Sequence, residues 1–268
     1  MSAHAHPNTT RLTRAGAGSA APAPRPGRAL GAALLCVLGL ALLWVVAELV
    51  PAARVRDAAL LQHFNALSGP HVDPLARRAI HLLDPGVMIF WGLALVLFAL
   101  ARRRGREALA VGVIFVAAPL SADFLKPLLA HSHPNAGPIQ IGSASWPSGH
   151  ATAAMALVLC AALVAPRRLR PLVAVVGAAF AAAVGCALLI RAWHMPSDVL
   201  GGYLLAGLWT ALAVAWLRAA ERRWPRRHLR QADTASAAGS RAAAPAAGRP
   251  RSQPGTRAEA EGRSAVLL

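Results

Sequence analysis

Apolar residues fall into six runs, each about as long as a bilayer is thick, with short polar segments between them. The runs cover residues 29–50, 80–101, 108–129, 149–165, 172–190 and 196–217. A helix needs roughly twenty apolar residues to cross the hydrocarbon core, where its backbone polar groups must bond internally. The pattern therefore predicts an all-α protein, a bundle of six transmembrane helices.

A more polar segment, residues 51–81, separates the first two runs. Its apolar residues recur at roughly helical spacing, at Ala59, Leu60, Phe64 and Leu67. Such a segment is too polar to cross a membrane but can lie along its surface. We expect one or two amphipathic surface helices between transmembrane helices one and two.

The two ends of the chain have a different composition. Residues 1–28 and 219–268 are rich in Ala, Pro, Gly and Arg and show no apolar periodicity. Segments of this kind cannot bury enough apolar surface to become ordered. We expect a disordered cytoplasmic tail at each end of a membrane domain at 29–218.

Charge follows the same division. The chain has a net charge of +17, but its arginines gather in the tails and in short loops at 102–106 and 167–170. This distribution fits membrane topology better than a nucleic-acid-binding face. Basic loops stay in the cytoplasm, so both termini are expected there, in a multi-pass protein of the plasma or inner membrane.

A polar turn, Pro147-Ser148-Gly149-His150, opens the fourth apolar run. The first N–H groups of a helix have no intrahelical partner, and the positive end of the helix dipole lies beside them. This arrangement suits a phosphate group. The predicted topology places the turn on the outer face, with the end of the third run and the turn between the fifth and sixth.

Those two neighbouring segments carry further ionisable residues. Lys126 and Asp123 lie near the end of the third run, and His194 precedes Asp198 by four residues. A carboxylate bonded to one imidazole nitrogen fixes the tautomer and leaves the other nitrogen free to attack. A second histidine, His150, can then protonate a leaving oxygen.

Three segments, 126–134, 147–150 and 194–198, resemble in order and spacing the motifs of the type 2 phosphatidic acid phosphatase superfamily. This family includes lipid phosphate phosphatases and vanadium haloperoxidases. The resemblance implies that His194 is the nucleophile and forms a phosphohistidine, that Asp198 supports it, and that His150 protonates the leaving group. It also implies phosphate binding without a metal or other cofactor, by Lys126, Ser148 and the N–H of Gly149.

Two positions depart from the family pattern. The arginine expected before Pro134 is His133, and the serine-arginine pair expected six residues before the nucleophile is Ala187-Leu188. A lost guanidinium removes a bidentate phosphate clamp. Arg191, one helical turn from Leu188, and a protonated His133 are the candidate replacements.

The expected substrate is a lipid phosphate or diphosphate, such as a polyprenyl diphosphate, phosphatidate or phosphatidylglycerophosphate, in contact with membrane lipids. Two alternatives remain open from the residues: a phosphotransferase that uses the same histidine, and a weakened lipid-phosphate binder or transporter. A fourth hypothesis is a metal site, with its ligands at His131, His133, His150 and His194.

Overall fold

The computed structural model describes residues 26–130, 139 and 141–224, and this part of the chain is all helical. His131 and His133, like both predicted tails apart from their innermost residues, lie outside the described residues. In chain order the helices are α1 Gly27–Leu49, α2 Pro51–Asn65, α3 Val72–His81, α4 Pro85–Ala101, α5 Gly105–Leu128, α6 Gly149–Val164, α7 Arg170–Ile190 and α8 Pro196–Arg223.

Six apolar helices correspond to the six predicted spans. Helices α1, α5, α7 and α8 are each long and apolar enough to cross a membrane, and the bent pair α3–α4 passes the same test as one unit. The sixth, α6, is apolar but has only 16 residues. The prediction of a helical, multi-pass membrane protein is confirmed.

Proline marks the breaks between these elements. Pro51, Pro85 and Pro196 each stand at the first position of a helix, where the missing N–H has no intrahelical partner in any residue. Between α3 and α4 the chain bends by 54°. The second apolar run, predicted from residue 80, therefore forms its long helix only from Pro85, and the predicted surface segment forms two helices, α2 and α3.

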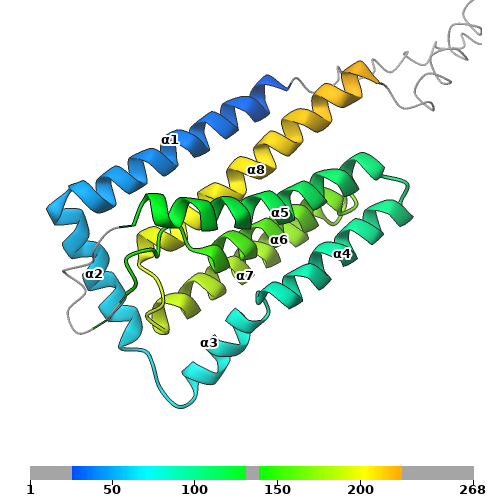
Figure 1. Ribbon diagram of the computed structural model, residues 1–268. Helices are drawn as coiled ribbons and strands as arrows, with labels where there is room; N and C mark the ends of the chain where they lie inside the picture. The colour runs from blue at the N-terminus through cyan, green and yellow to red at the C-terminus, as the bar shows by residue number, and fades with distance from the viewer. Residues whose placement is uncertain (1–25, 131–138, 140, 225–268) are drawn as a thin grey trace, which may run out of the picture. The chain divides into compact units, whose positions relative to one another are not determined.

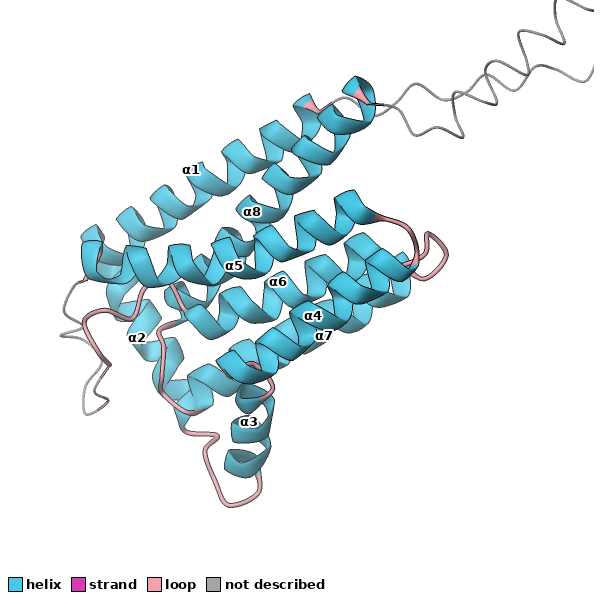
Figure 2. Cartoon of the chain, turned by 45° about the vertical axis from the view of Figure 1, so that its right-hand side comes forward, coloured by secondary structure: helices cyan, strands magenta, loops and turns pink. Residues whose placement is uncertain are grey.

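The bundle is built around α6, which packs against α4, α5, α7 and α8 (Figures 1 and 2). Its buried face consists mainly of small residues, including Ala151, Ala153, Ala154 and Ala156. Small side chains let helix backbones approach closely, which is how helices pack where apolar burial gives no advantage over lipid. Helix α1 packs on the outside, against α8.

The bundle has two chemically different ends (Figure 1). One end collects α2, α3, the starts of α4, α6 and α8, and the ends of α5 and α7. The other holds the two basic loops, where Arg104 donates to the Val164 carbonyl over 2.9 Å and Arg106 pairs with Glu221 over 3.2 Å. Glu221 belongs to α8, which runs six residues beyond the predicted boundary at 217.

Candidate active site

The polar turn before α6 forms a helix start, as its sequence indicates. Ser148 is the N-cap, and its Oγ accepts a hydrogen bond from the Ala151 N–H over 3.3 Å. Its own N–H donates to the Asp198 carbonyl over 3.0 Å, which ties the start of α6 to the first turn of α8. The N–H groups of Gly149 and His150 precede the first intrahelical bond and so mark the anion-binding end of α6.

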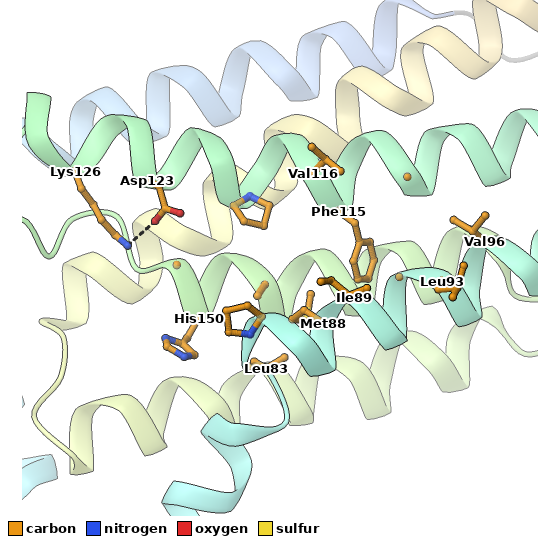
Figure 3. A pocket seen from close by; sticks show the side chains of 16 residues that line it. Leu83, Met88, Ile89, Leu93, Val96, Phe115, Val116, Asp123, Lys126 and His150 are labelled. Carbon is orange, nitrogen blue, oxygen red and sulfur yellow. Dashed lines mark hydrogen bonds and ion pairs between the residues drawn. The ribbon is translucent and has the colours of Figure 1, made fainter.

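Lys126 brings a positive charge to this helix start (Figure 3). Its Nζ lies 2.8 Å from Asp123 Oδ1, on the previous turn of α5. It also lies only 3.4 Å from the position that a Cβ on residue 149 would take. The glycine at this position therefore leaves room for the ammonium group directly beside the backbone of α6.

His150 lies among ionisable groups from several elements. Its ring centroid is 5.8 Å from that of Trp193, and its Nε2 is 4.0 Å from Asp84 Oδ1. His194, which follows Trp193 in the chain, is close enough to His150 for the two imidazoles to interact electrostatically. The two imidazoles that the sequence proposes as partners therefore lie at the same end of the bundle.

His194 and Asp198 form the expected pair. His194 Nδ1 lies 3.3 Å from Asp198 Oδ2, and the same oxygen accepts the Met195 N–H over 2.9 Å. The Asp198 side chain is only 1% exposed, and that of His194 13%. When Nδ1 carries the ring proton and donates a hydrogen bond to this carboxylate, Nε2 keeps a free lone pair.

A cavity of about 590 Å³ opens at this site between α4, α5 and α6 (Figure 3). Its polar lining residues are Asp123, Lys126, Gly149 and His150, and most of the remaining lining is apolar. Figure 3 labels the apolar lining residues Leu83, Met88, Ile89, Leu93, Val96, Phe115 and Val116, of which Leu93 and Val96 lie farthest from Lys126 and His150. The site thus combines a polar end, whose groups suit an anion, with an apolar groove.

The structure describes one of the two candidate replacements for the missing arginines, Arg191, but not the other, His133. Arg191 Nη1 lies 3.3 Å from Asp73 Oδ2 on α3, and Arg191 is absent from the lining of the cavity. His133 lies outside the described residues. At the positions of the expected serine and arginine, Ala187 and Leu188 are buried in the apolar core.

Several residues of the site had no sequence signal of their own. Asp57, on α2, accepts hydrogen bonds from the N–H and Oγ of Ser197. Asp84 caps α4 and places Oδ2 2.8 Å from His81 Nδ1. The contact between Asp57 and Ser197 joins segments 140 residues apart in the chain, and neither spacing nor periodicity encodes it. Only the polar character of these residues near proline breaks offered a hint.

Glycines on α8 allow the site to assemble. A Cβ on Gly202 would lie 2.6 Å from the Ser148 carbonyl oxygen, and one on Gly201 would lie 2.9 Å from the Trp146 ring. Because these distances are shorter than any side chain tolerates, α8 crosses the start of α6 in direct backbone contact. This crossing holds the Asp198 turn against the Ser148 turn.

Metal binding has no assembled ligand set among the described residues: they contain no cluster of three or more His, Cys, Asp or Glu side chains suited to it. Two of the four histidines of the metal hypothesis, His131 and His133, are outside that part of the chain. The polar groups at the cavity instead offer an ammonium, helix N–H groups and imidazole. These groups suit an anion.

Fold and site together define a helical membrane protein with a candidate anion-binding site at one end of its bundle. Residues 107–222 match the model of the PAP2 superfamily. The three-motif resemblance is thereby confirmed. At the level of the family, the match supports phosphatase activity.

One solved structure has a similar fold, the crystal structure of a transmembrane PAP2-type phosphatidylglycerolphosphate phosphatase from Bacillus subtilis. The TM-score is 0.59 at 19% sequence identity, over 72% of this chain and 98% of that one. A search of curated proteins found no match. The structural likeness confirms the membrane-helix fold.

Proposed function

We propose that this protein hydrolyses the phosphomonoester or diphosphate of a membrane lipid through a phosphohistidine on His194. The observation that carries the proposal is the cavity whose apolar groove ends at Lys126, Gly149 and His150. Polyprenyl diphosphates, phosphatidate and phosphatidylglycerophosphate all combine a phosphate group with long apolar chains. A soluble phosphate ester has no long apolar chain that could fill the groove.

The groove explains the preference for a lipid. Its walls include Ile89 and Val116, whose side chains are also exposed on the outside of the bundle, where lipid surrounds a membrane protein. A lipid chain can therefore pass from the bilayer into the groove between α4 and α5. Its phosphate then lies at the start of α6, where the Lys126 ammonium and the helix N–H groups neutralise its charge.

The reaction proceeds in two displacements. His194 Nε2 attacks phosphorus, and the bond from phosphorus to the leaving oxygen breaks. The leaving oxygen takes its electron pair and a proton from His150. Water then attacks the phosphohistidine, His150 accepts the water's proton, and the electron pair of the P–N bond returns to His194 as inorganic phosphate leaves. Asp198 stabilises the positive imidazole ring throughout.

The charge distribution supports an outward-facing site. The end opposite the cavity carries the basic loops, including Arg104, Arg106 and Arg170, together with the start of α1 and the end of α8. Because short basic loops stay in the cytoplasm, both termini are cytoplasmic and His194 faces the other side. The substrate is then a lipid of the outer leaflet.

The test is phosphate release from a panel of lipid mono- and diphosphates by the purified protein in excess chelator. We expect His194→Ala to lower kcat by at least 10³-fold, as loss of a nucleophile does, while His63→Ala, an exposed histidine of α2, keeps wild-type turnover. Turnover by His194→Ala equal to the wild type would exclude the mechanism. Transfer of phosphate to an added alcohol would indicate a phosphotransferase.

A further inference from the structure

His194, the proposed nucleophile, lies in a short turn between α7 and α8, residues 191–195. Helix α2 contacts the start of α8, directly after this turn. Ser197, in the first turn of α8, donates its Oγ to Asp57 Oδ2 over 2.6 Å and its N–H to Asp57 Oδ1 over 3.2 Å. One carboxylate thus holds both polar hydrogens of Ser197. Asp57 is 140 residues away in the chain.

The element before the turn is held from the same side. Asn65, the last residue of α2, donates its Nδ2 to the Ile190 carbonyl over 2.9 Å, at the end of α7. Arg191 is paired with Asp73 of α3. Asp73 is itself fixed by the hydroxyl of Ser68, 2.6 Å from its Oδ1. Polar contacts from α2 and α3 therefore hold both sides of the turn.

Apolar packing makes this external support rigid. Leu61 of α2 and Ile80 of α3 are 0% and 1% exposed. They share one core cluster with Leu188 and Val199, which flank the turn, and with Met195, its last residue. Tightly packed side chains transmit displacement instead of absorbing it, so α2 and α3 cannot shift without moving the turn.

The turn itself needs such support. Ala192 adopts a left-handed conformation, with φ 52°, which is unfavourable for a residue with a Cβ. Conformations of this kind persist where the surroundings determine the backbone position. Without the contacts from α2 and α3, we expect the turn to relax and His194 to move away from Asp198.

We propose that α2 and α3 form a clamp, made of Asp57, Asn65 and Asp73, that positions His194 for attack, with Asp57 as its principal positioning residue. The inference rests on the function proposed above. Asp57 touches neither the cavity nor His194. It fixes Ser197, the neighbour of Asp198, and so sets where the Asp198 carboxylate meets His194 Nδ1.

A double-mutant cycle on Asp57 and Ser197 tests the clamp. Asp57→Ala removes both bonds and should lower kcat by about 10- to 100-fold, since small displacements of catalytic groups have effects of that size. KM should stay within about twofold, because the groups that bind phosphate and lipid belong to α4, α5 and α6. Ser197→Ala should lower kcat less, and the double variant should match Asp57→Ala, because no bond remains to be lost. Arg56→Ala, an exposed neighbour on α2, is the matched control.

A second readout is independent of turnover. Diethyl pyrocarbonate modifies accessible imidazoles, and mass spectrometry can follow each histidine separately. We expect His194 to be modified at least threefold faster in Asp57→Ala than in the wild type, with the exposed His63 unchanged. Should Asp57→Ala fail to fold, Ser197→Ala serves in both measurements.

These readouts separate the clamp from the proposed function. A wild-type protein without phosphatase activity contradicts the function, while faster His194 modification still supports the clamp. Unchanged kcat in an active protein, or unchanged His194 modification in either variant, overturns the clamp. A rise in KM with kcat unchanged also overturns it, because it assigns Asp57 to binding.

Discussion

At the scale of single residues, the site depends on carboxylates in unequal surroundings. Asp198 is almost completely buried and shares one oxygen between the Met195 N–H and His194. Asp123 is 68% exposed and pairs with Lys126 near the surface. Asp57 is intermediate: burial raises the pKa of its carboxyl above the ordinary value of 3.8, the hydrogen bonds from Ser197 oppose that effect, and the charge of Asp198 adds to it.

Stability should depend on pH through Asp57. A raised pKa in the folded state means that folding favours the neutral carboxyl, so Asp57 contributes stability below its ordinary pKa of 3.8. That contribution is lost as pH rises through the raised pKa. Relative to Asp57→Asn, which cannot ionise, the wild type should therefore lose Tm as pH rises from about 3.5 to 7. Thermal unfolding followed by tryptophan fluorescence measures this, and a difference that grows in favour of the wild type would contradict it.

At the scale of elements, the site depends on how α8 crosses α6. The crossing brings together Ser148 and Asp198, whose backbones are joined by a 3.0 Å hydrogen bond. Gly202 allows this contact because any residue with a Cβ at this position would collide with the Ser148 carbonyl oxygen. The start of α6 and the carboxylate that pairs with His194 are thus fixed relative to one another by backbone contact.

Gly202→Ala should separate these two helices. Its Cβ would lie 2.6 Å from a backbone oxygen, which cannot move aside as a flexible side chain can. Overpacking of this kind costs about 1–3 kcal/mol, so we expect a lower Tm together with a lower kcat. Gly31→Ala on α1, where a Cβ meets nothing within 4 Å, is the control and should keep the wild-type Tm or exceed it. Equal Tm values for Gly202→Ala and wild type would show that the crossing can adapt.

At the scale of the whole bundle, polarity is divided between the two ends. Imidazoles, carboxylates and Lys126 gather where α2 and α3 lie, and the arginine-rich loops gather at the opposite end. Under the positive-inside rule, this division predicts the orientation proposed above. In that orientation the outer leaflet supplies the substrate.

Single cysteines should report that orientation. In a background with Cys36, Cys160 and Cys186 replaced by Ala, Leu67→Cys lies after α2 and Arg168→Cys lies in the loop before α7. A membrane-impermeant maleimide should label the first in intact cells and the second only after permeabilisation. The reverse pattern would place the active site in the cytoplasm.

Much of the fold could be predicted from sequence because hydrocarbon imposes simple rules. Helix positions followed from apolar length, and Pro51, Pro85 and Pro196 each begin a helix for reasons of local proline chemistry. The pairing of His194 with Asp198 followed from their spacing across a helix start. These features depend on residues close together in the chain, so local physical chemistry is enough to find them.

The sequence by itself determined the membrane class, the six apolar helices and the set of groups that could bind and cleave a phosphate ester. Tertiary structure decided that Arg191 pairs with Asp73, that Asp57 holds Ser197, and that Gly202 lies against Ser148. Each of these contacts joins residues at least 54 positions apart, and contacts at such separation follow from how the helices pack. The hydrophobic pattern along the sequence does not specify this packing, because any apolar helix face can be buried against any other.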